Sequence, residues 1–223
     1  PLTWAYYDGV EHIGFDPDLA VNELRAAGYL LPPNVIVRAK DNVSLSFTMV
    51  YPDDSIHTQL AQAIQQNWMA IGVEVKLQAV SYESLFNEYL TPRTYQAALV
   101  DLDLSRSYDP DPYPFWHQAE ITGGQNYAQW DNRTASEYLE QARVVADLNI
   151  RARLYRNFQV IFARELPALP LYYPIYTYGV DQRVQGVQAV PLFETADRFN
   201  GISFWYLVTR RALEQTIQPT VLP

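Results

Sequence analysis

The sequence predicts an α/β domain. Strand-like and helix-like segments alternate along the chain, and the joints between them are short. Hydrophobic residues make up 48% of the 223 residues and charged residues 18%, which is typical of a globular protein. The clearest pattern covers residues 44–80, where a strand, a helix and a second strand follow one another. Such a βαβ unit predicts a right-handed crossover and two parallel strands.

The first predicted element is a helix over residues 16–28. Asp16 can accept a hydrogen bond at its N-terminus, and Pro17 occupies the first helical position, where a missing N–H costs nothing. Gly28 is a typical residue at which a helix ends.

The βαβ unit starts with a strand over residues 44–51, in which alternate side chains are apolar. Asp53 or Asp54 opens the following helix, whose apolar side chains recur at four-residue spacing, and Gly72 ends it. From Val73 onward apolar and polar residues alternate again, which predicts the second strand.

The segments downstream continue the alternation. Ser81 caps a short helix, and residues 96–104 form a third strand. Residues 105–130 show no period and are rich in Asp, Pro, Tyr, Trp and Gly; a loop this long is usually functional or flexible. The later elements are a helix from 131 or 132 to 147, a helix from about 151 to 165, an extended segment over 169–180 that its prolines mark as an edge or kinked strand, and a short strand over 204–208.

Charge and composition exclude several classes of function. The formal net charge of -9 argues against a nucleic-acid partner, because phosphate binding requires a Lys/Arg surface. The chain has no cysteine, which excludes disulfides, thiolate nucleophiles and cysteine-bound metals. The histidines, His12, His57 and His117, are isolated in sequence and are expected on the surface or in loops, so neither a zinc site nor a cofactor is predicted.

Acidic residues near the end of the third strand and beyond it raise an enzymatic alternative. A hydrolase using Asp103 and Asp111 would need a cleft that shifts the pKa of a carboxyl group. The spacing of these residues matches no standard calcium loop. The Asp-Pro-Asp-Pro segment at 109–112 is more typical of consecutive turns and a helix start. We therefore expect a binding protein and not an enzyme.

Aromatic side chains gather in the same region, and aromatic residues make up 14% of the chain. Flat rings beside a few carboxylates suit a peptide or another amine-bearing solute, since a carboxylate pairs with ammonium and rings pack against varied side chains. We expect about half of the rings to anchor the segment to its own domain instead. A carbohydrate-binding module would also explain the rings, but it predicts a β-sandwich. The predicted ligand-binding residues are Asp103, Asp101, Tyr108, Tyr113, Trp116, Tyr127 and Trp130.

Four segments, in this order, resemble family 5 of the extracytoplasmic solute-binding proteins, which serve ABC importers for oligopeptides, dipeptides, nickel complexes and some sugars. They are the helix that ends in Ala27-Gly28-Tyr29, the helix-to-strand passage at 60–75, the block from Tyr95-Gln96-Ala97-Ala98-Leu99 to Asp109-Pro110-Asp111-Pro112, and the segment at 153–172 that ends in Pro170-Leu171-Tyr172.

The resemblance implies lobe II of the type II periplasmic-binding-protein fold, a mixed sheet flanked by helices. On this interpretation residues 1–223 form a single α/β lobe, and the N-terminal lobe of the family is absent. The chain would then carry half of an interlobe cleft, and alone it would bind solute weakly or not at all.

The implied function is capture of a solute, expected to be a peptide, for an ABC importer. The implied partners are the permease subunits and the missing lobe, and we expect a monomer that is extracytoplasmic and lipid-anchored in its full-length form. In the family a strand-end aspartate holds the ligand's amino group. Asp103 is the nearest match and Asp101 the second, although Val100-Asp101 stands where the family usually has Gly-Trp.

Overall fold

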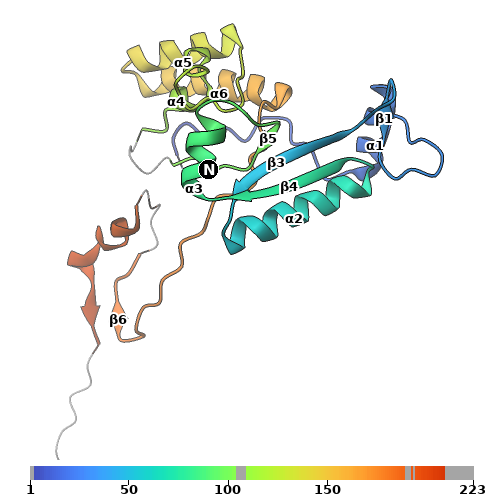
Figure 1. Cartoon of the computed structure of the whole chain (residues 1–223). Coiled ribbons are helices and arrows are strands. Elements are labelled where there is room, and N and C mark those ends of the chain that lie inside the picture. Colours follow the sequence, from blue (N-terminus) through green and yellow to red (C-terminus); the bar gives the residue numbers. More distant parts are fainter. Residues whose placement is uncertain (1–2, 104–108, 189–191, 193, 209–223) are drawn as a thin grey trace, which may run out of the picture. The chain divides into compact units, whose positions relative to one another are not determined.

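The computed structural model describes residues 3–103, 109–188, 192 and 194–208 (Figure 1). The chain divides into two compact units. Of the described residues, the first contains 3–103 and 110–169, and the second contains 109, 170–188, 192 and 194–208. The described elements of the first unit are α1 (Pro17–Ala26), β1 (Ala39–Lys40), β2 (Val43–Ser44), β3 (Ser46–Pro52), α2 (Ser55–Ala70), β4 (Glu74–Val80), α3 (Tyr82–Ser84), η1 (Leu85–Leu90), β5 (Ala97–Ala98), α4 (Tyr113–Trp116), η2 (Gln118–Glu120), α5 (Arg133–Val144) and α6 (Leu148–Glu165).

A parallel sheet forms the centre of the first unit, with β3 between β4 and β5. The parallel pairing of β3 with β4 confirms the prediction for residues 44–80. The third strand is shorter than the predicted 96–104, because only Ala97–Ala98 pairs with β3. The N–H of Leu99 still donates to the carbonyl of Val50 at 2.9 Å, and then the chain leaves the sheet.

Helices cover both faces of this sheet (Figure 1). Because successive strand residues point to opposite faces, Met49 packs in the cluster under α2 whereas Val50 packs with η1. The carboxylate of Asp54 caps α2, accepting hydrogen bonds from the N–H groups of Ile56 at 2.9 Å and His57 at 3.0 Å. The helix starts where the sequence predicts because this cap depends only on neighbouring residues.

Helices α5 and α6 pack against each other around a separate hydrophobic cluster. Leu139 of α5 is fully buried there, and Phe158 of α6 is 5% exposed. The chain's first described residues join this cluster: the side-chain amide of Gln159 accepts from the N–H of Tyr7 at 3.1 Å and donates to the carbonyl of Ala5 at 2.9 Å. The two predicted helices are confirmed, and α6 starts earlier than residue 151 because Asp147 caps it.

Two short helices occur in the segment for which the sequence predicts a loop. The described part of 105–130 contains α4 and η2, so the prediction of a continuous loop was wrong for those residues, whereas α4 confirms the helix start predicted from the Asp-Pro-Asp-Pro segment at 109–112. Pro112 directly precedes α4, and the amide of Asn126 fixes the following turn by bonding the carbonyls of His117 and Trp130. Side-chain hydrogen bonds of this kind leave no periodic signal in the sequence.

The second unit contains little regular structure. Its strands β6 (Val184–Gln185) and β7 (Tyr206–Leu207) pair antiparallel, and β7 confirms the predicted strand over 204–208 in a shorter form. The predicted strand over 169–180 is not formed, and the prolines of that segment provide no N–H for a ladder. The remaining described elements are η3 (Thr195–Phe199) and η4 (Ile202–Phe204). Within the described residues of the whole chain, no helix has the length and apolar character that a membrane span requires.

Candidate functional site at the carboxyl edge of the sheet

Four polar side chains meet where the three parallel strands end. Asp54 and His57 follow β3, Tyr82 follows β4, and Asp101 follows β5. We call these four residues the carboxyl-edge cluster. Open parallel sheets bind their ligands just beyond the carboxyl ends of their strands. The topology therefore places the cluster at the edge where a ligand site is expected.

The imidazole of His57 lies between two carboxylates. Its Nδ1 is 2.6 Å from Oδ2 of Asp54, and its Nε2 is 3.3 Å from each of the two oxygens of Asp101. The His57 side chain is 10% exposed, whereas those of Asp54 and Asp101 are 41% and 62% exposed. Both ring nitrogens face acceptors, an arrangement that only the doubly protonated imidazolium satisfies.

These contacts shift the titration of both partners. Burial alone would lower the pKa of His57, but the hydrogen bonds and Coulombic attraction of Asp54 and Asp101 outweigh it, and the pKa is raised above its usual value. The pKa of Asp54 is lowered, mainly by the hydrogen bond from the His57 backbone and further by the imidazole. The contacts between His57 and Asp54 therefore favour the charged form of each partner.

Tyr82 holds Asp101 from a second side. Its hydroxyl donates to Oδ2 of Asp101 at 2.9 Å, and its ring meets the imidazole of His57 edge to face, with the ring centres 6.0 Å apart. Asp101 thus has a defined orientation while most of its side chain remains open to solvent. An exposed and oriented carboxylate can bind an ammonium group or another hydrogen-bond donor of a solute.

The two predicted aspartates differ in how the structure holds them. Asp101 belongs to the carboxyl-edge cluster, and Asp103 lies two residues further along and is exposed. Tyr108 is outside the described residues. That Asp101, Asp103 and Tyr108 bind the ligand stays a prediction.

Two predicted rings pack into the cluster of α5 and α6. Trp130 is 9% exposed, and its indole N–H donates to Oε2 of Glu165 at 2.9 Å. The ring of Trp116 meets Phe162 edge to face, with the ring centres 4.7 Å apart. Burial leaves Trp130 little surface for a ligand, so its side chain anchors the preceding segment to α6.

Two side chains pack against the ring of Tyr113, which remains partly exposed. The imidazole of His117 stacks on one face at 4.0 Å between ring centres, and the guanidinium of Arg143 lies 3.6 Å from the ring centre. Arg143 also donates to Oδ2 of Asp111 at 2.7 Å. Asp111 is therefore held in an ion pair with Arg143, which gives no support to the hydrolase alternative.

Tyr127 is half-buried against a residue that the sequence analysis missed. The guanidinium of Arg93 lies 4.9 Å from its ring centre and donates to the carbonyls of Ile121 at 3.1 Å and Gly124 at 2.8 Å. Burial raises the pKa of Tyr127. Arg93 thus fixes the turn that carries Tyr127, through contacts about 30 residues apart that no local pattern reveals.

The expectation that the histidines lie on the surface or in loops was wrong for His57, which is buried within α2, whereas His117 lies in the connection between α4 and η2 but is also buried. His57 is 8% exposed and His117 is 2% exposed, whereas His12 is exposed. Both buried rings are satisfied by carboxylates from distant parts of the chain, Asp101 for His57 and Glu140 for His117.

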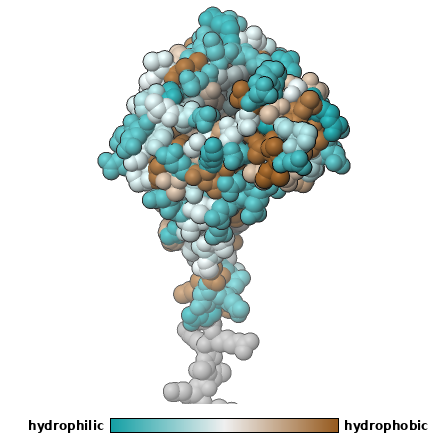
Figure 2. All heavy atoms as spheres, turned by 45° about the vertical axis from the view of Figure 1, so that its right-hand side comes forward, coloured by the Kyte–Doolittle hydropathy of each residue, from teal (hydrophilic) through white to brown (hydrophobic). Residues whose placement is uncertain are grey.

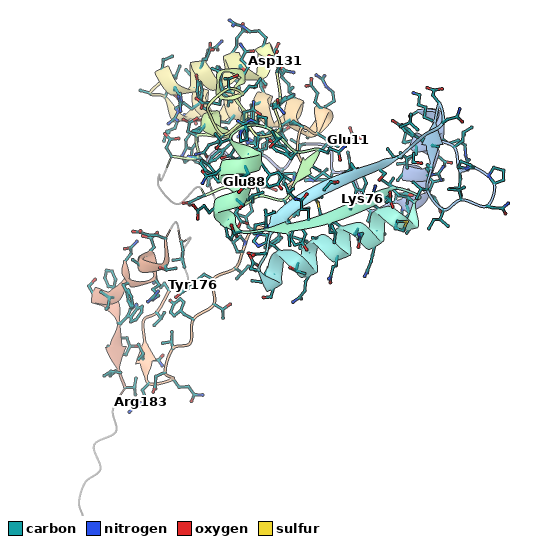
Figure 3. All side chains as sticks on the ribbon, viewed as in Figure 1. Glu11, Lys76, Glu88, Asp131, Tyr176 and Arg183 are labelled. Carbon is teal, nitrogen blue, oxygen red and sulfur yellow. The ribbon has the colours of Figure 1, made fainter. Side chains whose placement is uncertain are left out.

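The second unit has a shallow recess of its own, with a volume of about 360 Å³. Its walls include the rings of Tyr176, Phe199 and Trp205. Arg198 donates to the hydroxyl of Tyr176 at 2.8 Å, and Figure 3 labels this tyrosine. The sequence analysis named none of these residues, because the recess forms between segments about 20 residues apart.

Solved structures identify the fold to which this architecture belongs. The chain is similar to the oligopeptide-binding protein AppA from Bacillus subtilis in complex with a nonapeptide, with a TM-score of 0.72 and 24% identity over 94% of this chain and 41% of that one. It is similar to NikZ from Campylobacter jejuni in complex with Ni(L-His), with a TM-score of 0.68 and 18% identity over 91% and 41%. The fold is that of the type II periplasmic binding proteins, as predicted, and the β-sandwich alternative is wrong.

The family follows from the sequence comparison. The family described as "Bacterial extracellular solute-binding proteins, family 5 Middle" matches residues 1–126, more than half of the chain, and the chain therefore belongs to it. Members of this family are extracytoplasmic solute-binding proteins, and the family is not a catalytic one. The oligopeptide-binding protein AppA of Bacillus subtilis (strain 168) is 25% identical over 210 residues, and the dipeptide-binding protein of Escherichia coli (strain K12) is 26% identical over 197. The chain spans 38% and 35% of the length of these two relatives.

Proposed function

We propose that this chain captures a peptide or another amine-bearing solute outside the cytoplasm for an ABC importer. The observation that carries the proposal is the oriented and exposed carboxylate of Asp101 at the carboxyl edge of the sheet. A charge-assisted hydrogen bond to an ammonium group is among the stronger polar contacts available to a protein. Relatives named for oligopeptide and dipeptide binding support the same solute class.

Asp103 and the predicted rings supply further contacts in this proposal. Asp103 is exposed beside Asp101, and Tyr113, Trp116 and Tyr127 are each partly exposed. The rings pack against side chains of the solute and the carboxylates bind its amino group.

We further propose that residues 1–223 form one lobe and that a second lobe closes the cleft above the carboxyl edge. The fraction of the relatives' length that the chain spans supports this arrangement. The complete protein then works as a lipid-anchored monomer that delivers solute to permease subunits. A single lobe buries a ligand on one side only, so residues 1–223 alone bind solute weakly or not at all.

Calorimetry with tri-alanine on the genome-encoded protein tests the solute class. Asp101→Asn keeps the shape of the side chain and removes its charge, and we expect affinity to fall roughly 10- to 100-fold, since a hydrogen bond to a charged group contributes about 1.5–3 kcal/mol. Asp103→Asn is measured in parallel. Asp8→Asn is the matched control, because Asp8 is exposed and distant in sequence from the cluster. Wild-type affinity in both Asp101→Asn and Asp103→Asn, or no peptide binding by the wild-type protein, contradicts the proposal.

A further inference from the structure

His57 has no role in the proposed contacts, yet it is the best-satisfied titratable group at the carboxyl edge. The groups that face its imidazole are Asp54 from the N-terminus of α2, Asp101 from the segment after β5 and Tyr82 from α3. When His57 is protonated, the three charged groups of the carboxyl-edge cluster sum to one negative charge. When His57 is neutral, they sum to two. The proton on His57 therefore sets the local charge at Asp101.

The geometry leaves Asp101 able to bind a second partner. The Nε2 atom of His57 is 3.3 Å from both oxygens of Asp101, which is longer than the roughly 2.7–2.9 Å of a tight charge-assisted bond. The bond to Asp54, at 2.6 Å, is much shorter. The imidazolium is thus held mainly by Asp54 and bonds only weakly to Asp101, so a solute can approach the exposed side of Asp101 without displacing His57.

We propose that His57 is a specificity-determining residue: as an imidazolium it disfavours a cationic amine at Asp101, and as a neutral imidazole it admits one. This inference rests on the proposed function, because it takes Asp101 to face the solute. Thermodynamic linkage fixes the sign. A bound ammonium group repels the imidazolium and favours loss of its proton, so affinity for the amine rises as the pH rises through the titration of His57.

The expected effect is modest but measurable. An ammonium group bonded to the far side of the Asp101 carboxylate lies roughly 6 Å from Nε2, by adding ordinary hydrogen-bond lengths. Because the Asp101 side chain is 62% exposed, solvent screens the two charges nearly as bulk water does, and unit charges at this separation then change affinity by roughly three- to tenfold. A neutral His57 orients Asp101 less firmly, which by itself would weaken amine binding. This opposing effect is small, because the hydroxyl of Tyr82 continues to bond to the carboxylate.

The test compares tri-alanine affinity of the genome-encoded wild-type protein and His57→Gln from pH 5.5 to 8.5. The amino group of the peptide titrates in both measurements, so the ratio of the two affinities isolates His57. We expect wild type to bind roughly three- to tenfold more weakly than His57→Gln at the lowest pH and equally at the highest. His12→Gln, which changes an exposed histidine, should match wild type throughout. A ratio that is constant with pH overturns the proposal.

A ligand-free measurement separates this inference from the proposed function. NMR titration of the His57 ring is followed in wild type and in Asp101→Asn. The inference requires a lower titration midpoint in Asp101→Asn, because the neutral amide no longer stabilises the imidazolium. If tri-alanine does not bind at any pH, the peptide proposal fails and this arm decides: a lowered midpoint supports the coupling of His57 to Asp101, and an unchanged midpoint refutes it.

Discussion

Leu139 offers a direct test of the packing that holds α5 against α6. Its side chain is fully buried in the cluster that also contains Phe158 and Trp130. Leu139→Ala removes three carbon atoms, whose transfer from water contributes roughly 0.8 kcal/mol each. The remaining cavity adds a further cost, because neighbouring side chains relax only partly. We therefore expect the free energy of unfolding of the first unit to fall by about 3–5 kcal/mol.

Urea denaturation followed by tryptophan fluorescence measures this change. Trp130 reports on the same cluster. If the slope of unfolding free energy against urea concentration is unchanged, the variant still unfolds from a compact state. Val144→Ala is the matched control on α5, since Val144 is 83% exposed and its truncation should change stability by no more than about 0.5 kcal/mol. A loss below about 1 kcal/mol for Leu139→Ala, or equal losses in both variants, would refute the assignment of this cluster as the core of α5 and α6.

Two other outcomes follow from the structure. The pKa of His57 is raised by its carboxylate partners, so its contribution to stability is complete below the unfolded pKa of about 6.5 and is lost as the pH rises through the folded pKa. The urea concentration at the unfolding midpoint of the wild-type protein should therefore decrease as the pH is raised through the folded pKa. In His57→Gln the midpoint should decrease less over the same pH range. Gly72→Ala should be more destabilising than Gly123→Ala in the same assay. Both glycines have positive φ, at 85° and 78°, but a Cβ on Gly72 would lie 2.9 Å from Arg38 Cγ, while one on Gly123 meets nothing within 4 Å. Similar losses in the two variants would show that Arg38 moves aside freely.

Local signals predicted the helices and the parallel pairing, because each depends on residues close in sequence. Asp16 and Asp54 cap helices that begin at the next residue, and the spacing of apolar residues over 44–80 predicts the two parallel strands. Hydrophobic residues nonetheless remain on the visible surface among hydrophilic ones (Figure 2). The apolar character of a single residue was therefore a weaker indicator of burial than the regular spacing of several apolar residues.

The candidate site was only partly predictable. Asp101 was named because the family resemblance implies a ligand-binding aspartate at a strand end, but the role of His57 depends on a contact 44 residues away. The rings of Tyr113 and Trp130 were named as binding residues because composition cannot distinguish a ring that meets a ligand from one that packs on its own helices. The structure adds packing partners that the sequence did not reveal, Arg143 for Tyr113 and Glu165 for Trp130, which lie about 30 residues further along the chain.

The hydrogen bonds between Gln159 and the chain's first residues constrain when the protein can fold during synthesis. Tyr7 leaves the ribosome long before Gln159, which follows it by 152 residues. At typical elongation rates of about 5–20 residues per second, the opening segment waits on the order of ten seconds for the helix on which it docks. During that interval the ring of Trp4, which later packs against that of Tyr155 with the ring centres 5.6 Å apart, has no folded surface to contact and is accessible to a chaperone.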